Sequence, residues 1–471
     1  MTQHPPGDIR GWTVVLAAVG VNLIIGALYA WSVMGKALAG QWHWTKTQAM
    51  LPFATATASF AVTMIFAGRW QDRIGPRYVA MLGGILFGLG MVLSAFVHTY
   101  GLMLITFGLV GGMGIGLGYS ATTPPSIKWF PPAKKGLITG IVVSGVGLAA
   151  VYISPLTNYL LEVTTIQQTF FILGAGTIRL VSLLAQLLAN PPAGYAPAPA
   201  EPSTGSGAKP APAARRDLDW HEMLRTRQFY QLWLMFVLSA SAGLLIIGNI
   251  TLIAQDRAPE WDKAFLLVMV VAIFNTCGRF VSGFLSDRIG RTNTMILASV
   301  LQAINMFLFT QYRTPALLVF GSAFTGLCYG TIFTLFPAAT ADFYGVRNLG
   351  VNYGSVFTAF GVAGVTGSVL GGRVRDLFGS YTYAFIACGV MLLAGAVLAF
   401  LLKAPKIDSI PPAPPADAGN AAKPGRTGAI KQAGDPCVMN GDSLSLCHQQ
   451  WPISLCALGA LWLCVFQVTA A

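Results

Sequence analysis

Apolar runs of membrane-spanning length recur along the chain, separated by short polar segments. A helix needs about 20 apolar residues to cross a hydrocarbon core of about 30 Å. Six such runs precede residue 190 and six follow residue 227, at residues 12–34, 48–67, 78–98, 101–127, 136–161 and 167–189, then 228–253, 264–285, 293–312, 315–336, 349–371 and 381–402. The pattern predicts an all-α polytopic membrane protein with twelve transmembrane helices in two six-helix bundles.

The polar segments predict the domain boundaries. We expect an N-terminal six-helix bundle at residues 1–189, a cytoplasmic linker at 190–222 and a C-terminal six-helix bundle at 223–405. The linker is rich in Pro, Ala and Gly and has no periodic apolar face, as is typical of extended connecting segments. Residues 406–471 are expected to form a tail that carries one extra apolar segment, at 452–471.

Composition and charge support a membrane location. Hydrophobic residues make up 54% of the 471 residues, charged residues only 10%, and the mean hydropathy is +0.63. Soluble domains contain about 25% charged residues. The net charge of +12 does not indicate nucleic-acid binding, because the basic residues lie in short loops on one side of the predicted helices. We therefore expect a multi-pass protein with a cytoplasmic N-terminus.

The sequence offers no chemistry typical of an enzyme. The seven cysteines have no metal-ligand spacing, and we expect no disulfide between Cys437 and Cys447 if they face the cytoplasm. No His/Asp/Cys constellation is embedded in a predicted span, and no phosphate-binding loop is present. We expect neither catalysis nor a metal nor a cofactor.

A motif of nine or ten residues after the second predicted helix recurs after the eighth. G-R-W-Q-D-R-I-G-P-R begins at Gly68, and G-F-L-S-D-R-I-G-R begins at Gly283. The repeat at equivalent places indicates two pseudo-symmetric halves. Its glycines, acids and arginines are predicted to latch the cytoplasmic helix ends in one conformation, although a charged stop-transfer turn could explain a single copy. The predicted latch residues are Gly68, Asp72, Arg73, Arg77, Gly283, Asp287, Arg288 and Arg291.

Arg279 lies well inside the eighth predicted helix, about two turns before Asp287. A guanidinium in hydrocarbon costs several kcal/mol, so it is expected to face a water-filled cavity or a partner. We interpret Arg279 as the ligand of an anionic substrate; the alternatives are a snorkelling or a structurally paired arginine. Arg179, in the middle of the sixth helix, is a weaker candidate.

Two six-helix halves with the repeated G-x-x-x-D-R-x-G-x-R loop resemble the major facilitator superfamily over residues 10–403. Five further segments resemble the oxalate:formate antiporters and the related monocarboxylate transporters: L-Y-A-W-S at 28–32, K-W-F-P-P-A-K-K-G-L-I-T-G at 128–140, E-M-L-R-T-R-Q-F-Y-Q-L-W at 222–233, N-x-x-x-R at 275–279 and L-F-P-A-A-T-A-D at 335–342. The resemblance implies a cytoplasmic (plasma) membrane transporter from a prokaryote, with Arg279 as its substrate residue.

The resemblance also suggests the rest of the binding site. Asn275 lies one turn before Arg279, where many monocarboxylate transporters have an Asp. The second cation of the oxalate carriers, a Lys in helix 11, is replaced here by Phe360. Further expected lining residues on the family's cavity-facing helices are Leu28, Tyr29, Tyr119, Tyr329, Phe333 and Phe357. One cation favours a monoanion, because two buried carboxylates need two counter-charges.

We therefore predict a secondary transporter of a small monocarboxylate, such as L-lactate or pyruvate, that works by alternating access as a monomer in the lipid membrane. An oxalate:formate-type exchanger is the alternative. Proton symport is implied by the resemblance alone, because the spans contain no clear mid-membrane Asp, Glu or His. Arg cannot carry the proton, since it does not deprotonate in proteins.

Overall fold

A computed structural model describes residues 6–131, 135–192, 195, 217–345 and 348–405. They belong to one compact unit, Met1–Ile407, and contain helices without strands. Twelve helical segments are long and apolar enough to cross a membrane, which confirms the predicted count. The extra apolar segment at 452–471 and most of the linker lie outside the described residues.

Among the first six spans, the first and the fourth each consist of several helical pieces, and the other four are single helices. Their elements are α1 (Pro6–Ile25), η1 (Gly26–Ala30), α2 (Trp31–Gln41), α3 (Lys46–Ile74), α4 (Pro76–Ser94), α5 (Tyr100–Met103), η2 (Leu104–Gly111), α6 (Gly112–Ser120), α7 (Thr123–Lys128), α8 (Lys135–Val163) and α9 (Ile166–Ala185). The first span is broken by the 3₁₀ segment η1, and the fourth contains the π-helical segment η2.

The second set of spans is more regular. A short helix, α10 (Trp220–Leu224), precedes α11 (Arg227–Arg257), α12 (Phe265–Ile289), α13 (Arg291–Phe309), α14 (Pro315–Tyr344), α15 (Leu349–Phe378) and α16 (Thr382–Phe400). Asp219 and Glu222 form a capping box at α10, and Leu218 donates its backbone N–H to the Tyr344 carbonyl at the end of α14. The end of the predicted linker is therefore fastened to the C-terminal half.

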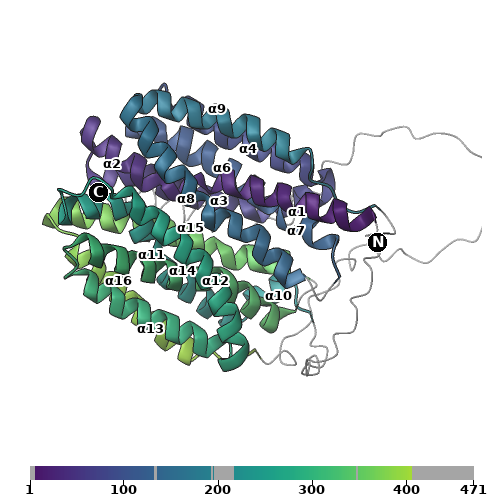
Figure 1. Cartoon of the computed structure of the whole chain (residues 1–471). Coiled ribbons are helices and arrows are strands. Elements are labelled where there is room, and N and C mark those ends of the chain that lie inside the picture. Colours follow the sequence, from purple (N-terminus) through teal and green to yellow (C-terminus); the bar gives the residue numbers. More distant parts are fainter. Residues whose placement is uncertain (1–5, 132–134, 193–194, 196–216, 346–347, 406–471) are drawn as a thin grey trace, which may run out of the picture. The chain divides into compact units, whose positions relative to one another are not determined.

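Helices pack mainly within each half, and three pairs make the most extensive contacts between the halves (Figure 1). In the N-terminal half α1 packs on α8, α4 on α9 and α3 on α6; in the C-terminal half α12 packs on α14, α11 on α15 and α13 on α16. Across the halves α3 packs on α15, α8 on α12, and α2 on α11. The core between the halves is therefore formed by helices 1, 2, 5, 7, 8 and 11 of the twelve spans.

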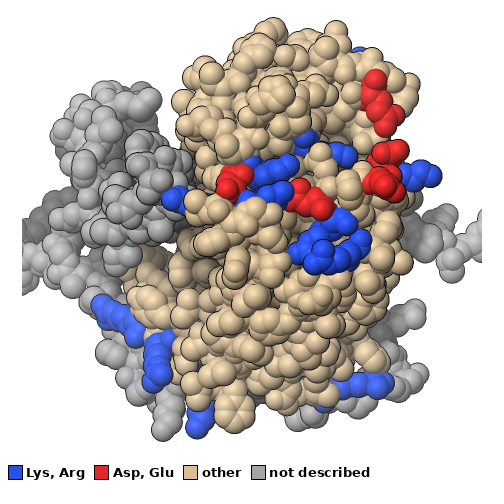
Figure 2. Space-filling view, turned by 90° about the vertical axis from the view of Figure 1, so that its left-hand side faces the viewer, with Lys and Arg blue, Asp and Glu red and all other residues tan. Residues whose placement is uncertain are grey.

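The halves are fastened together at the end of the bundle where α3 begins. The Asp376 carboxylate, at the end of α15, accepts hydrogen bonds from the backbone N–H groups of Lys46 (3.0 Å) and Thr47 (2.8 Å) and from the Thr47 hydroxyl (2.6 Å). Within the C-terminal half, the neighbouring Arg375 pairs with Asp256 of α11. Figure 2 shows this end of the molecule, with basic and acidic side chains gathered in a band across it.

Candidate functional site

Close backbone packing places Arg279 in the interior of α12. A Cβ on Gly278 would collide with the Leu327 carbonyl of α14, and a Cβ on Gly330 would collide with the Asn275 carbonyl. Glycines at such contacts let two membrane helices approach closely. The Arg279 carbonyl also accepts a hydrogen bond from the Thr334 hydroxyl of α14, at 3.1 Å. These contacts fix the backbone from which the guanidinium extends.

The Arg279 guanidinium reaches from the C-terminal half to the N-terminal half. Its side chain is buried, with the residue 8% exposed, and Nη1 donates to the Val143 carbonyl of α8 at 2.7 Å. The Phe333 ring lies under it, with the ring centroid 4.7 Å from Cζ, which is a favourable cation–π distance. No described residue accepts a hydrogen bond from Nε, and no described carboxylate pairs with the guanidinium.

A narrow cavity lies beside this arginine, between the two halves. It is small, with room for about one water molecule, and its walls come from η1 and α8 on one side and from α11 and α12 on the other. Tyr29, Gly147 and Asn275 line it. The Asn275 side chain is buried, and its Oδ1 has no described hydrogen-bond donor. The cavity thus combines apolar walls with a few polar groups, as small-molecule sites do.

Tyrosines from both halves surround the guanidinium. Tyr29, Tyr119, Tyr329 and Tyr353 all lie near Arg279. The hydroxyls of Tyr29 and Tyr329 are near each other, but the buried Tyr329 hydroxyl has no partner with hydrogen-bond geometry among the described residues. Leu28 is buried next to Tyr29 on η1.

The remaining predicted lining residues form a packed aromatic cluster beside Arg279. Phe357 stacks on Phe360 with centroids 5.1 Å apart, and Phe333 contacts the Phe360 ring edge to face at 5.9 Å. Tyr119 stacks on Phe357 at 6.5 Å. Phe360 is fully buried in this cluster, so the position that resembles a lysine site holds a ring packed among other rings.

Sequence reasoning missed several members of the site. Phe60 of α3 contacts Tyr119, Phe357 and Phe360, and so links the rings of both halves. Tyr353 of α15 contacts Phe357 at 5.7 Å. Val143 offers its backbone carbonyl to the arginine, and Gly147, which has no side chain, lies beside it. An apolar residue inside a membrane-spanning run looks the same in the sequence whether or not it lines a site. A role of a backbone carbonyl cannot be recognised from the residue type.

The repeated motif forms the same turn in both halves. Gly75 and Gly290 end α3 and α12 with φ/ψ of 89°/157° and 91°/157°, a region that only glycine adopts readily. Neither of the predicted latch glycines lies at a close helix crossing: no neighbour lies within 4 Å of a Cβ placed on Gly68, and for Gly283 the nearest atom is Thr334 Cγ2 at 3.7 Å. The turn glycines are the ones that the backbone requires.

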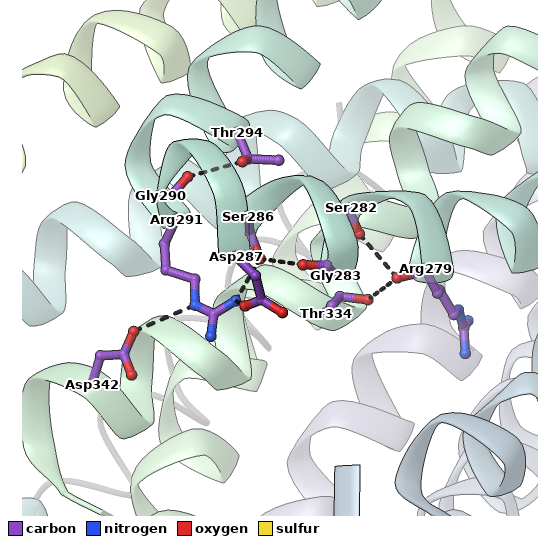
Figure 3. A network of polar contacts seen from close by, with 10 residues as sticks. All are labelled: Arg279, Ser282, Gly283, Ser286, Asp287, Gly290, Arg291, Thr294, Thr334 and Asp342. Carbon is purple, nitrogen blue, oxygen red and sulfur yellow. Dashed lines mark hydrogen bonds and ion pairs between the residues drawn. The ribbon is translucent and has the colours of Figure 1, made fainter. Parts of the chain in front are cut away.

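Arg291 is the centre of a polar cluster in the C-terminal copy (Figure 3). It pairs with Asp287 at 3.1 Å and with Asp342 of α14 at 3.4 Å, and it also donates to the Ser286 hydroxyl. Arg288 instead covers the Phe284 ring, 4.2 Å from its centroid. Figure 3 shows the Arg279 guanidinium pointing away from this cluster, so the predicted binding and latch residues occupy separate places on α12.

The N-terminal copy is described in part. Arg77 donates to the Gln186 side chain at the end of α9, and Arg73 is exposed. The Asp72 side chain lies outside what the structure describes. Arg179 is exposed on α9, a helix that does not belong to the core between the halves. This position does not suit a substrate ligand, and it fits an arginine that extends toward the membrane surface.

Comparison with known proteins identifies the fold's relatives. The family model described as Major Facilitator Superfamily matches residues 12–310 and 260–470. The chain is 28% identical over 356 residues to the uncharacterized MFS-type transporter YhjX of Escherichia coli (strain K12), covering 75% of this chain and 86% of that protein. It is 25% identical to the oxalate:formate antiporter of Oxalobacter formigenes, covering 83% and 91%, and 25% identical to monocarboxylate transporter 13 of Bos taurus, covering 83% and 89%.

Among solved structures, a bacterial homologue of the human lysosomal transporter Spinster in an inward-facing, occupied conformation is similar in fold. The TM-score is 0.59 at 14% sequence identity, and the match covers 85% of this chain and 97% of that chain. This likeness concerns the arrangement of the helices. It carries no information about the substrate.

Proposed function

The chain belongs to the Major Facilitator Superfamily, and from that premise we propose that it is a secondary active transporter of a small monocarboxylate anion, such as L-lactate or pyruvate. Relatives named as an oxalate:formate antiporter, monocarboxylate transporters and an apicoplast pyruvate carrier support this substrate class. The proposed orientation places the N-terminus and the D-R-x-G loops in the cytoplasm of a prokaryotic cell, with the protein a monomer.

One observation carries the proposal: a buried guanidinium between the halves that has no acidic partner among the described residues and leaves its Nε–H without an acceptor. A permanent charge with an unused donor is unfavourable in a membrane interior. A carboxylate supplies the missing charge and accepts two parallel N–H bonds from the arginine fork. At about 4 Å and an effective dielectric of about 20, the attraction is about 4 kcal/mol.

The aromatic cluster favours a monoanion over oxalate. A second carboxylate buried next to Phe360 and Phe357 would find no second cation, besides Arg279, among the described residues that surround these rings. Burying an unpaired carboxylate costs several kcal/mol. Burying the apolar end of a monocarboxylate next to these rings carries no such desolvation cost. An oxalate:formate-type exchanger therefore remains the second candidate, supported by the 25% identity to the Oxalobacter formigenes protein alone.

Transport by alternating access would break and remake the contacts between the halves. Asp376 joins the halves at the end where α3 begins. The Arg291 cluster lies at the other end of the bundle and ties α12 to α14 within the C-terminal half. We propose that the halves rock around Arg279 between these two ends. A coupled proton would ride on the substrate or on the tyrosines near Arg279, since Arg279 itself keeps its proton.

Uptake into proteoliposomes tests the proposed function. Initial uptake of labelled L-lactate should be measurable for the natural protein and should fall to background for Arg279→Ala, because the variant loses the cation that replaces the hydration of the carboxylate. Arg179→Ala is the matched control: it removes an arginine from another membrane helix, but at an exposed position. This control should retain uptake.

The same assay separates the candidates. Lactate uptake stimulated by an inward proton gradient supports symport, whereas uptake of oxalate that needs internal formate supports the exchanger. Near-normal lactate uptake by a folded Arg279→Ala protein would remove the proposed role of this residue.

A further inference from the structure

Gly147 of α8 lies against the Arg279 guanidinium. A Cβ built on Gly147 would lie 3.6 Å from both Cζ and Nη2 of Arg279, and 2.8 Å from the Thr276 hydroxyl. Gly147 also lines the cavity between the halves, together with Asn275 and Tyr29. It therefore occupies the place where a side chain would separate the guanidinium from that cavity.

The hydrogen bond to Val143 determines which edge of the guanidinium remains available. Nη1 is held by the Val143 carbonyl at 2.7 Å, and the ring of Phe333 covers one face. Nε has no acceptor among the described residues although it is buried, and no described hydrogen bond uses Nη2. Nε–H and the neighbouring Nη2–H point the same way, and they form the side-on fork that binds a carboxylate with two parallel bonds.

We propose that Gly147 is a specificity-determining residue: because it lacks a side chain, it leaves room beside the Nη2 end of the Arg279 guanidinium for a carboxylate and for the first carbon attached to it. This inference rests on the proposed function and adds the geometry of that site. The Val143 carbonyl keeps its hydrogen bond to Nη1 while the substrate occupies the other edge. The hydrogen bond to Val143 thus fixes the orientation of the guanidinium, so that its Nε–H and Nη2–H keep one direction.

Other glycines of α8 have different surroundings. A Cβ on Gly145 would lie 2.7 Å from the Val19 carbonyl of α1, which is helix packing within the N-terminal half. A Cβ on Gly140 would meet a single atom, Phe280 Cε1, at 4.0 Å. Gly140 is two turns from Gly147 on the same helix and also faces α12. It is the natural control, since the same substitution there fills open space.

The test measures ligand-induced stabilisation of the purified protein rather than transport. The melting temperature in detergent is recorded against rising concentrations of formate, acetate and L-lactate for the natural protein, Gly147→Ala and Gly140→Ala. A ligand that binds the folded state raises the melting temperature by mass action. For Gly147→Ala we expect the half-saturating concentration of lactate to rise about tenfold or more, the scale of one lost charge-assisted hydrogen bond.

Formate should be much less affected by Gly147→Ala, because it has only a hydrogen on its carboxylate carbon. The ratio of the lactate to the formate half-saturating concentration should therefore rise in Gly147→Ala and stay unchanged in Gly140→Ala. A general loss of stability would weaken both ligands together and leave this ratio constant.

A double variant separates selectivity from packing. Gly147→Ala/Thr276→Ala removes the hydroxyl that the new methyl group would meet. The melting temperature of the double variant without ligand should therefore return to that of the natural protein, while its ratio of lactate to formate half-saturating concentrations should stay as high as in Gly147→Ala. If the ratio recovers together with the melting temperature, or if Gly147→Ala binds lactate as the natural protein does, Gly147 is a packing residue and the proposal is wrong. If no monocarboxylate stabilises the natural protein, the proposed function fails, and this inference fails with it.

Discussion

At the scale of single residues, the site combines one charge with groups that cannot neutralise it. The Val143 carbonyl and the Phe333 ring stabilise the Arg279 guanidinium through partial charges, and neither removes its net charge. Asn275 lies one turn away and offers an amide, which forms hydrogen bonds but does not titrate. The positive charge therefore remains available to an anion from solution.

Asn275→Asp would change this balance. A carboxylate at this i, i+4 position would pair with Arg279 and compete with the substrate. We expect uptake of labelled lactate at neutral pH to fall about tenfold or more, given an attraction of about 4 kcal/mol at about 4 Å. Protonation neutralises the new carboxyl, so the loss should shrink as the pH falls. Initial rates at several pH values, relative to those of the natural protein, measure the effect.

Asn275→Ala is the control for this prediction. It removes the amide without adding a titratable group, so its uptake relative to the natural protein should not vary with pH. An Asn275→Asp profile parallel to that of Asn275→Ala would show that residue 275 does not communicate with Arg279.

At the scale of helices and turns, the duplicated motif fixes how each half reverses direction. Gly75 and Gly290 have nearly the same backbone angles, and each ends one long helix immediately before the next begins. The sequence indicated the duplication but emphasised Gly68 and Gly283. The structure needs the later glycine of each copy, since a positive φ is required only at the turn.

Gly290→Ala should therefore destabilise the C-terminal half. An alanine in this backbone region costs about 1–3 kcal/mol. We expect a lower melting temperature of the purified protein in detergent. Gly283→Ala is the matched stability control, because it adds the same methyl group to a helical residue with space around it. Equal melting temperatures for the two variants would contradict the role assigned to the turn.

At the scale of the whole molecule, contacts between the halves determine which end of the bundle is closed. Asp376 accepts from the first N–H groups of α3, and Gly372 on the same helix lets α15 approach, since its Cβ would lie 2.8 Å from both the Lys46 carbonyl and the Thr47 amide nitrogen. A carboxylate at a helix N-terminus is stabilised by the helix dipole and by the unpaired N–H groups there. This contact must break when the end opens.

Asp376→Asn should shift the protein toward the conformation in which this end is open. The substitution keeps the side-chain shape and removes the charge, which is worth about 0.3–1 kcal/mol at an exposed helix end, or about a two- to fivefold change in the equilibrium. Spin labels at the exposed residues Gln41 and Glu260, one in each half, report the change as a larger population of long distances. Asp262→Asn, an exposed acid of the same half, is the control and should leave the distances unaltered.

The sequence by itself determined the membrane class, the twelve spans, the duplication and the buried arginine, because each depends on local composition or spacing. A run such as 264–285 must cross the membrane as a helix, whatever its neighbours. The tertiary structure alone decided that η1 interrupts the first span at Tyr29, that Phe60 joins the aromatic cluster, and that Val143 and Gly147 direct the guanidinium. These features depend on backbone atoms and packing between residues far apart in the chain, which no local pattern records.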